Sequence, residues 1–509
     1  MKKIVKCKRI LSAAACVSVA ALALAGCGNP QAAKEDNGSK PILKAMGVYQ
    51  KDDYNAYPVA KVLEERTGYH VEYDMLPQDK WEEKLNLVMA SGDSYDIVTI
   101  MGSGRARYID YAEQGALIEL GPLIDQYAPN IKAHVAESSL EEATVDGKLY
   151  GIPNGSAVKP GNTVANTAIA VRADLLEQAG IQKPETLEEF TQFLREIKAK
   201  DPGGNGSNNI PMVISSTPEV NGLMGAFGIE NMWNTAEDGT LRHRVNTPAY
   251  EDYLKYMHAL YTEGLIDNEF PTNKSATTIE KFTSGRAVVM PMSWVDAPNV
   301  MAALHSSFPD ARVEYLNPIA SAEGQRGLQA GKSGSGMDRI TFIPKTAKHP
   351  EEAVKWMNAK LEPETFKLMT IGEEGIHYTV KDGEYYPIQP AFLNERGSAN
   401  NFMNGIDKDN YPDYWMMRVR KDAEMEKYFD LLNTDLKEYH ETTPAAGSPM
   451  SSATAKNLQA MNQMAADNAV KFVVGSNDFS QFSKFVEEWK AAGGEQYIKE
   501  LNEWKATKN

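Results

Sequence analysis

Cysteine is almost missing from this sequence of 509 residues, and its three thiols, Cys7, Cys16 and Cys27, all fall near the N-terminus. The rest of the chain is therefore expected to hold no disulfide and no cysteine-bound metal. Long apolar runs are missing too: after residue 26 no run reaches the roughly 18 residues of a membrane-spanning helix. The sequence has no HExxH motif, no GxSxG motif and no phosphate-loop spacing, and its histidines show no metal-ligand spacing. These absences count against the common hydrolase and nucleotide-binding classes.

The sequence has fewer basic than acidic residues. The chain has 53 Lys and Arg against 69 Asp and Glu, and loss of residues 1–26 would remove five basic groups and no acidic ones. The remaining chain would then carry a net charge of −21, from 48 basic and 69 acidic groups. Nucleic-acid binding relies on basic patches, so no nucleic-acid partner is expected. The hydrophobic content of 42% favours a folded chain, and its length favours two or more domains.

Residues 1–26 have the build of an export signal, with a basic start, an apolar middle and small residues at the end. The apolar part, Ile10 to Leu24, spans about fifteen residues, fewer than the roughly 20 that a bilayer crossing needs. The tetrapeptide Leu24-Ala25-Gly26-Cys27 resembles the bacterial lipobox, whose cysteine is acylated, for example with palmitate. This resemblance implies a lipid anchor at Cys27, followed by a flexible polar leash at 27–40. The alternative is an ordinary signal peptide that happens to contain a cysteine.

The apolar pattern between residues 41 and 101 predicts strands at 41–49, 70–76 and 95–101, separated by two helices. Such an order indicates a parallel sheet with helices on its faces. Two capping boxes are predicted at helix starts, one at Asp79 and Glu82 and one at Thr186 and Glu189. Three later strands are predicted, at 287–292, 313–316 and 340–343.

Several segments resemble, in their order along the chain, the long lipoprotein branch of the family 1 extracellular solute-binding proteins, the sugar-capturing components of bacterial ABC importers. They include Asp96-Ile97-Val98 and the DGKLYGIP run at 146–153, and further segments lie at 111–129, 171–176, 184–190, 282–294, 372–378 and 473–504. The resemblance implies an α/β fold of two lobes, the type II periplasmic-binding-protein fold, in which each lobe is a mainly parallel sheet flanked by helices. It implies a hinge between the lobes. The implied limits are 41–155 and 319–376 for lobe 1, 156–318 and 377–470 for lobe 2, and 471–509 for C-terminal helices.

The function that this resemblance implies is capture without catalysis. A monomeric protein on the extracytoplasmic face of a bacterial membrane would bind a carbohydrate, an oligosaccharide above all, and deliver it to ABC permease subunits. Ligand would bias an open–closed equilibrium through its greater affinity for the closed state. The alternatives are a surface carbohydrate-active enzyme such as a lyase or hydrolase, a structural lipoprotein, and a binding protein for a peptide or a sugar acid.

Ligands of open α/β sheets bind beyond the carboxyl ends of the strands, and sugars need flat aromatic faces beside hydrogen-bonding groups. Trp294 follows a predicted buried strand, at the point where an aromatic residue of the resembled family stacks on sugar, and Asp296 is a possible acceptor for hydroxyl groups. The other predicted ligand-binding residues are Tyr49, Gln50, Asp53, Ser103, Arg105, Asn154, Trp233, Tyr378 and Trp415. For each of them, packing or a solvated loop position is the alternative.

Residues 201–211 resemble a calcium loop of the family that borrows EF-hand chemistry. Asp201, Asn205 and Asn209 keep part of that pattern, but Gly203 stands where an Asn is usual and no acidic residue follows Asn209. A tight loop is therefore predicted, with a degenerate calcium site as the alternative. No other cofactor is expected.

Overall fold

The computed structural model describes residues 40–508, except residues 93, 160 and 333–335. The predicted signal peptide, the predicted anchor Cys27 and nearly all of the predicted leash lie outside the described residues. In the described part of the chain, no helix is both long enough and apolar enough to cross a membrane.

A five-stranded sheet forms the first lobe, with its strands in the order β2 (Val71–Met75), β1 (Leu43–Gly47), β3 (Ile97–Met101), β15 (Arg339–Phe342) and β6 (Gly151–Asn154). β1 is parallel to β2 and β3, whereas β15 is antiparallel to both of its neighbours. β15 is therefore the one reversed strand of this sheet. The first three strands confirm the elements predicted for residues 41–101.

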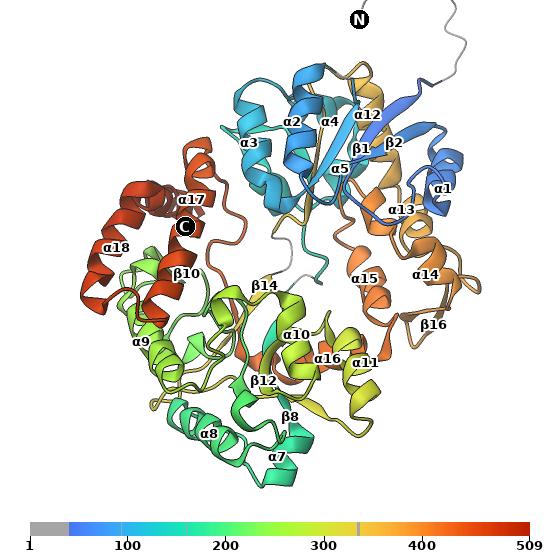
Figure 1. Ribbon diagram of the computed structural model, residues 1–509. Coiled ribbons are helices and arrows are strands. Elements are labelled where there is room, and N and C mark those ends of the chain that lie inside the picture. The colour runs from blue at the N-terminus through green and yellow to red at the C-terminus, as the bar shows by residue number, and fades with distance from the viewer. Residues whose placement is uncertain (1–39, 93, 160, 333–335, 509) are drawn as a thin grey trace, which may run out of the picture. The chain divides into compact units, whose positions relative to one another are not determined.

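Helices cover both faces of the first sheet, since successive apolar residues of its strands point to opposite sides. Val98 packs in one cluster with the helices α2 (Trp81–Ser91) and α3 (Arg105–Glu113). Ile97 packs in the other cluster with α1 (Pro58–Thr67) and α12 (Pro350–Lys360). Figure 1 shows these helices around the strands of the first sheet. The other helices near this sheet are α4 (Gly121–Tyr127), α5 (Pro129–His134), α6 (Glu137–Glu142), α13 (Pro363–Thr370), α14 (Ala391–Arg396) and α15 (Tyr411–Val419).

The second lobe is built on a four-stranded sheet, in the order β13 (Val313–Tyr315), β8 (Thr167–Arg172), β12 (Ala287–Ser293) and β9 (Ile210–Met212). β8 is antiparallel to β12 and β13, and β12 is parallel to β9. Each sheet thus has one reversed strand, which is the first strand that the chain adds to that sheet after crossing from the other lobe. The helices of this lobe are α7 (Ala173–Ala179), α8 (Leu187–Lys200), α9 (Pro248–Thr262), α10 (Ser275–Thr283), α11 (Ala297–Ser307) and α16 (Ala423–Asp430).

Three crossing segments pair with one another in a small sheet of their own, β18 (His440–Thr442), β14 (Leu328–Lys332) and β7 (Thr163–Ala165). Core packing gives lobe limits that differ from the predicted ones. Ile319 and Leu328 pack with the second sheet, so the chain returns to the first lobe after residue 330 rather than at 319. Residues from Phe392 to Met417 pack with the first sheet, so the chain next leaves the first lobe after residue 417 rather than after residue 376.

The C-terminal helices α17 (Ser452–Val473), α18 (Phe482–Trp489) and α19 (Glu495–Lys508) follow the last crossing. Phe472 and Trp489 pack in the second-lobe core, whereas Ala455 packs beside α3 of the first lobe. The long helix α17 therefore contacts both lobes.

Helix starts confirm one predicted cap and contradict the other. Thr186 accepts a hydrogen bond from the Glu189 amide, and the Glu189 carboxylate accepts one from the Thr186 amide, which is the predicted capping box of α8. The box predicted at Asp79 is wrong. The residue before α2 is Lys80, with a φ of 57° and no side-chain cap, so Asp79 lies one position too early.

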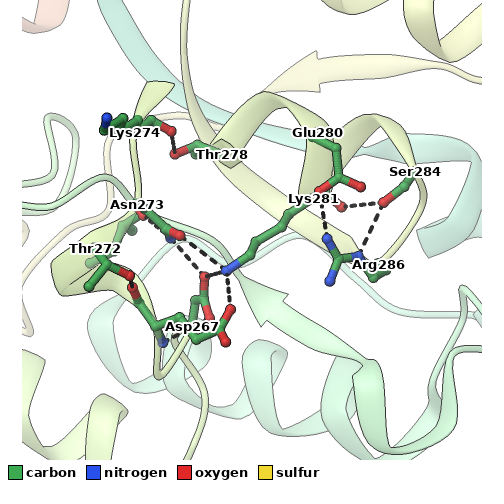
Figure 2. A network of polar contacts seen from close by, with 11 residues as sticks. Asp267, Thr272, Asn273, Lys274, Thr278, Glu280, Lys281, Ser284 and Arg286 are labelled. Atoms are coloured by element: carbon green, nitrogen blue, oxygen red, sulfur yellow. Dashed lines mark hydrogen bonds and ion pairs between the residues drawn. The ribbon is translucent and has the colours of Figure 1, made fainter. Parts of the chain in front are cut away.

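A buried ion pair holds α10 beside the loop that precedes it (Figure 2). The Lys281 ammonium lies 2.7 Å from the Asp267 carboxylate and 3.1 Å from the Asn273 side-chain oxygen, and it also reaches Glu269 at 2.8 Å. Burial would raise the pKa of Asp267, but hydrogen bonds from Lys281 and Asn273 outweigh it and lower that pKa. Because α10 leads directly into β12, this pair helps to place the strand that ends at the candidate site.

Candidate functional site

The two sheets contribute to one pocket of about 600 Å³. Asn154 and Arg339 line it from the end of the first sheet, and Asn166 and Val295 line it from the end of the second. Ligands of such sheets bind beyond the carboxyl ends of the strands, in pockets of roughly 300–1,000 Å³. This pocket is therefore the candidate functional site.

The reversed direction of β15 brings Arg339 to this edge. Arg339 is the first residue of β15, and it pairs in register with Met101 and Asn154, the last residues of β3 and β6. Its side chain is 10% exposed, forms an ion pair with Asp338, and donates a hydrogen bond to the Asn401 side-chain oxygen at 2.9 Å. The guanidinium group is thus fixed in place at the wall of the pocket.

Asn154 fixes the neighbouring chain segment. Its side-chain oxygen accepts a hydrogen bond from the Gly405 amide at 2.8 Å, and its side-chain nitrogen donates to the Met403 carbonyl at 3.4 Å. Gly405 has a φ of 104°, and a Cβ there would lie 3.0 Å from Val135. Both facts favour glycine at this position. Asn154 therefore shapes the pocket by holding the 403–405 segment across the strand ends.

A buried polar network ties the 403–405 segment to the first sheet. The Asn404 amide nitrogen donates to the Thr341 hydroxyl at 2.8 Å and to the Thr99 hydroxyl at 3.3 Å. The Lys360 ammonium donates to the Phe402 carbonyl at 2.8 Å and to the Asn404 side-chain oxygen. Burial lowers the pKa of Lys360 well below its ordinary value. Every polar group of this network lies in the interior, so the wall of the pocket is tied to the first sheet.

Trp415 provides the aromatic surface of the pocket, and Trp294 packs against it. The two ring centroids lie 5.9 Å apart at 89°, and Phe429 completes the cluster at 5.2 Å from Trp294. Trp294 is 7% exposed and does not line the pocket, whereas its neighbour Val295 is 49% exposed and does. The aromatic residues that line the pocket are therefore Trp415 and Tyr411, and Trp294 packs against Trp415.

Of the predicted ligand-binding residues, Asn154 and Trp415 line the pocket. Asp296 is half-buried at the start of α11, and loss of solvent raises its pKa. Gln50 is buried and accepts a hydrogen bond from Asn401, the same side chain that holds Arg339. Contact of any of these residues with ligand stays a prediction.

Tyr49 lies elsewhere on the same lobe. It is 48% exposed and lines a second pocket of about 230 Å³ with Trp81 and Met101. Asp53 accepts hydrogen bonds from the amide and the side chain of Asn55, and Ser103 is exposed in the short turn before α3. Neither Asp53 nor Ser103 lines the 600 Å³ pocket.

Three further predicted residues have structural partners away from that pocket. Arg105 donates to the carbonyls of Glu142 and Ser448, at 2.7 and 3.3 Å. Trp233 is buried against His243 and Tyr497 near the C-terminal helices. Tyr378 is buried in the first-lobe core, with its ring centroid 5.3 Å from that of Tyr385.

The predicted calcium loop is closed by its own hydrogen bonds. Both carboxylate oxygens of Asp201 accept backbone N–H groups, from Asn205 at 3.0 Å and from Gly206 at 2.6 Å. The side-chain nitrogen of Asn205 donates a hydrogen bond to the Gly285 carbonyl, and the side-chain nitrogen of Asn209 donates one to the Ile197 carbonyl. This is the predicted tight loop, and calcium binding stays an untested alternative.

Among the described residues, only His134, Asp407 and Asp409 bring three possible metal-ligand atoms within 4.8 Å of one another. The Asp407 carboxylate is fully buried and already accepts hydrogen bonds from the amides of Asp409 and Asn410 and from the Asn410 side chain. The Asp407 carboxylate is thus satisfied by protein groups, whereas the Nδ1 of His134 is buried without a hydrogen-bond partner in the described part of the chain.

The sequence analysis missed several residues that line the pocket, namely Asn166, Val295, Arg339, Asn400, Tyr411 and Arg418. For Arg339 a signal existed, because it immediately precedes the predicted strand at 340–343. Using that signal required knowing that this strand runs opposite to its neighbours. Residues 400–418 carried no such signal, since they follow no strand of either sheet.

Comparison with known proteins agrees with this geometry. The family profile described as bacterial extracellular solute-binding protein matches residues 49–365. Lipoprotein LipO of Bacillus subtilis (strain 168) is 26% identical over 502 residues, covering 95% of this chain and 96% of that protein. The polygalacturonan/rhamnogalacturonan-binding protein YtcQ of the same organism is 24% identical over 498 residues, covering 94% and 95%.

Among solved structures, the ABC-transporter substrate-binding protein FusA of S. pneumoniae in complex with kestose has a TM-score of 0.68 at 20% identity. The likeness covers 92% of this chain and 99% of that one. It shows that the fold is the two-lobed α/β fold of solute-binding proteins.

Proposed function

We propose that this chain, which belongs to the bacterial extracellular solute-binding protein family, captures an oligosaccharide between its two lobes and delivers it to an ABC permease. Family membership makes it a solute-binding protein and not an enzyme, and the names of relatives such as the fructooligosaccharide-binding FusA support a carbohydrate ligand and an ABC importer. The observation that carries the proposal is the pocket where the two sheets end, with an aromatic face at Trp415 beside the amides of Asn166 and Asn400.

The chemistry of the pocket suits a sugar. The ring face of a pyranose is apolar and packs on a flat aromatic surface, while its hydroxyl groups need donors and acceptors around the ring. Two relatives support this choice of ligand by name: YtcQ binds polygalacturonan or rhamnogalacturonan, and FusA is a fructooligosaccharide substrate-binding protein. Because both lobes line the pocket, a ligand held there would favour the closed form by binding it more tightly.

Replacing Trp415 by alanine should weaken oligosaccharide binding about ten- to a hundredfold, or roughly 1.4–2.8 kcal/mol, because the variant loses the stacking face. The measurement is isothermal titration calorimetry with the glycan that stabilises the wild-type protein most in a thermal-shift screen. Trp504→Ala is a matched control, because Trp504 is also half-buried but lines a different pocket. Equal affinities of the two variants would reject Trp415 as the platform, and absence of any glycan binding by the wild-type protein would reject the proposed function.

We further propose that acylated Cys27 tethers the protein to the outer face of the cell membrane, where it works as a monomer. The lipobox-like run at 24–27 supports this location, and LipO, which matches along nearly the whole chain, is a lipoprotein by name. One acyl chain alone binds a membrane only weakly, so stable attachment takes at least two lipid groups.

Substituting serine for Cys27 should move the protein from the membrane fraction to the soluble fraction, because the hydroxyl group is not acylated. Fractionation of expressing cells, with metabolic labelling by a palmitate analogue, checks this result. Cys16→Ser is the control, since Cys16 lies in the apolar part of the predicted signal and its loss should leave both labelling and location unchanged. Membrane retention of the labelled Cys27→Ser protein would contradict the anchor.

A further inference from the structure

The pocket is positively charged although the chain as a whole is acidic. The chain carries a net charge of −16, yet the charged side chains that line the pocket, among the residues that the structure describes, are two arginines, Arg339 and Arg418, and one aspartate, Asp338. The Asp338 side chain is 57% exposed and paired with Arg339, so its charge is partly screened by solvent. A net positive lining in an acidic protein favours an anionic ligand.

Arg339 has buried donor capacity that the protein does not use. A guanidinium group carries five N–H donors in a planar fork. Within the described residues those of Arg339 reach Asp338 and Asn401, and its Nε is buried without a hydrogen-bond partner. A buried donor left without an acceptor costs about 1–3 kcal/mol, so an acceptor supplied by a ligand would remove this cost.

Arg418 lines the same pocket as Arg339 and has no carboxylate partner among the described residues. It donates hydrogen bonds to the Arg396 and Gly397 carbonyls and to the side-chain oxygen of Asn400. Asn400 is next in sequence to Asn401, which accepts a hydrogen bond from Arg339. Both guanidinium groups influence the Tyr411 hydroxyl. Burial raises the pKa of Tyr411, and the positive charges of Arg418 and Arg339 oppose that rise. Neutral carbonyl and amide oxygens fix the position of Arg418 but leave its charge uncompensated.

A third cation lies near Arg418. Lys421 is half-buried and makes no hydrogen bond or ion pair to any residue that the structure describes. Burial lowers the pKa of Lys421, and the positive charge of Arg418 lowers it further, whereas the neighbouring Asp422 carboxylate raises it. Arg418 and Lys421 are thus two neighbouring cations at the C-terminal end of α15.

We propose that the ligand is an acidic oligosaccharide whose uronate carboxylate is received by Arg339 and Arg418. This inference rests on the proposed function, since it narrows the sugar that the same pocket takes. A planar carboxylate fits the guanidinium fork with two parallel hydrogen bonds, and charge-assisted bonds of this kind are about twice as strong as neutral ones. The ring that carries the carboxylate packs on Trp415 and Val295 at the same pocket.

The test compares sugars that differ only in charge. Titration calorimetry is run with trimers of galacturonate, glucuronate and mannuronate, each beside its carboxyl-reduced neutral counterpart, and with triglutamate as an acidic peptide. We expect at least one uronate trimer to bind about tenfold or more tightly than its reduced counterpart. Arg418→Gln should remove most of that preference while changing binding of the reduced trimer little. Arg339→Gln should act in the same direction, with circular dichroism as the check on its folding.

Arg312→Gln is the control variant, because Arg312 is an exposed arginine paired with Glu177 outside the pocket. It should leave the preference for uronate unchanged. Equal binding of charged and reduced trimers, or binding of neutral sugars alone, would overturn the inference and leave the proposed function standing. Arginine-dependent binding of triglutamate without binding of any uronate would overturn it in favour of a peptide ligand. Binding of no sugar at all would reject both.

Discussion

Replacing Lys281 by methionine should destabilise the second lobe by about 3–5 kcal/mol, because the change leaves the Asp267 carboxylate buried without its cation. Lys281 and Asp267 are 3% and 5% exposed, so water cannot take over the role of the lost partner. The free energy of unfolding is measured by urea titration, with the fluorescence of the second-lobe tryptophans as signal. Affinity of the folded variant for its ligand should not change, since the pair lies near the start of β12 and the pocket lies at its end.

Figure 2 also contains the matched control for this prediction. Arg286 pairs with Glu280 at 2.6 Å, but these side chains are 35% and 57% exposed. Exposed pairs contribute about 1 kcal/mol or less, so Arg286→Met should unfold almost as the wild-type protein does. Adding Asp267→Asn to Lys281→Met removes the unpaired charge and should restore part of the lost stability. If the single Lys281 variant were as stable as Arg286→Met, the buried pair would not stabilise the lobe.

The pH dependence of this pair has a definite sign. The folded-state pKa of Asp267 lies below its ordinary value, so its contribution to stability is complete above the ordinary pKa, about 3.9, and is lost as the pH falls through the folded-state value. The difference in the free energy of unfolding between the wild-type protein and Lys281→Met should therefore become smaller as the pH is lowered.

The fold could be predicted largely from the sequence because its main signals are local. A nearly continuous apolar run at residues 95–101 predicted the buried strand β3, and the Thr186 and Glu189 spacing predicted the start of α8. The lobe limits depend on long-range packing instead. Phe392 and Ile319 are both apolar residues outside the main strands, and nothing in their sequence neighbourhood indicates which sheet each will meet.

The site was harder to predict, for a geometric reason. Side chains alternate in direction along a strand and just beyond it, so a position one residue away decides whether a side chain meets the core or the pocket. Trp294 follows β12 and was the first candidate, yet it is buried, and Val295 beside it lines the pocket. The aromatic face comes from Trp415, more than a hundred residues later, on a helix that packing alone brings to the site.

The same long-range packing explains why a lysine that has no carboxylate partner in the described part of the chain supports the pocket. Lys360 is 1% exposed, donates to the Phe402 carbonyl and lies 3.4 Å from the centre of the Trp356 ring. These contacts use oxygen dipoles and a ring face instead of an acidic group, so they compensate the charge only partly. The ammonium form is therefore disfavoured in the folded state, and burial lowers the pKa of Lys360.

The free energy of unfolding should consequently rise with pH in the range just below the ordinary lysine pKa of about 10.4, by an amount that depends on Lys360. In the unfolded chain this lysine binds a proton up to about pH 10.4, while the folded site releases it at lower pH. The unfolded state thus binds more protons in this window, and stability rises with pH by up to about 1.4 kcal/mol per unit. In Lys360→Met that part of the slope should vanish, because methionine has no group that binds or releases a proton. The measurement is the difference in urea-unfolding free energy between wild type and variant across the window.

Lys355→Met, on the same helix, should not show this rise, because its hydrogen bond with Glu352 raises the pKa of Lys355. A constant difference for Lys360→Met would mean that the folded protein holds this ammonium charged, stabilised by the carbonyl, the amide oxygen and the indole ring alone.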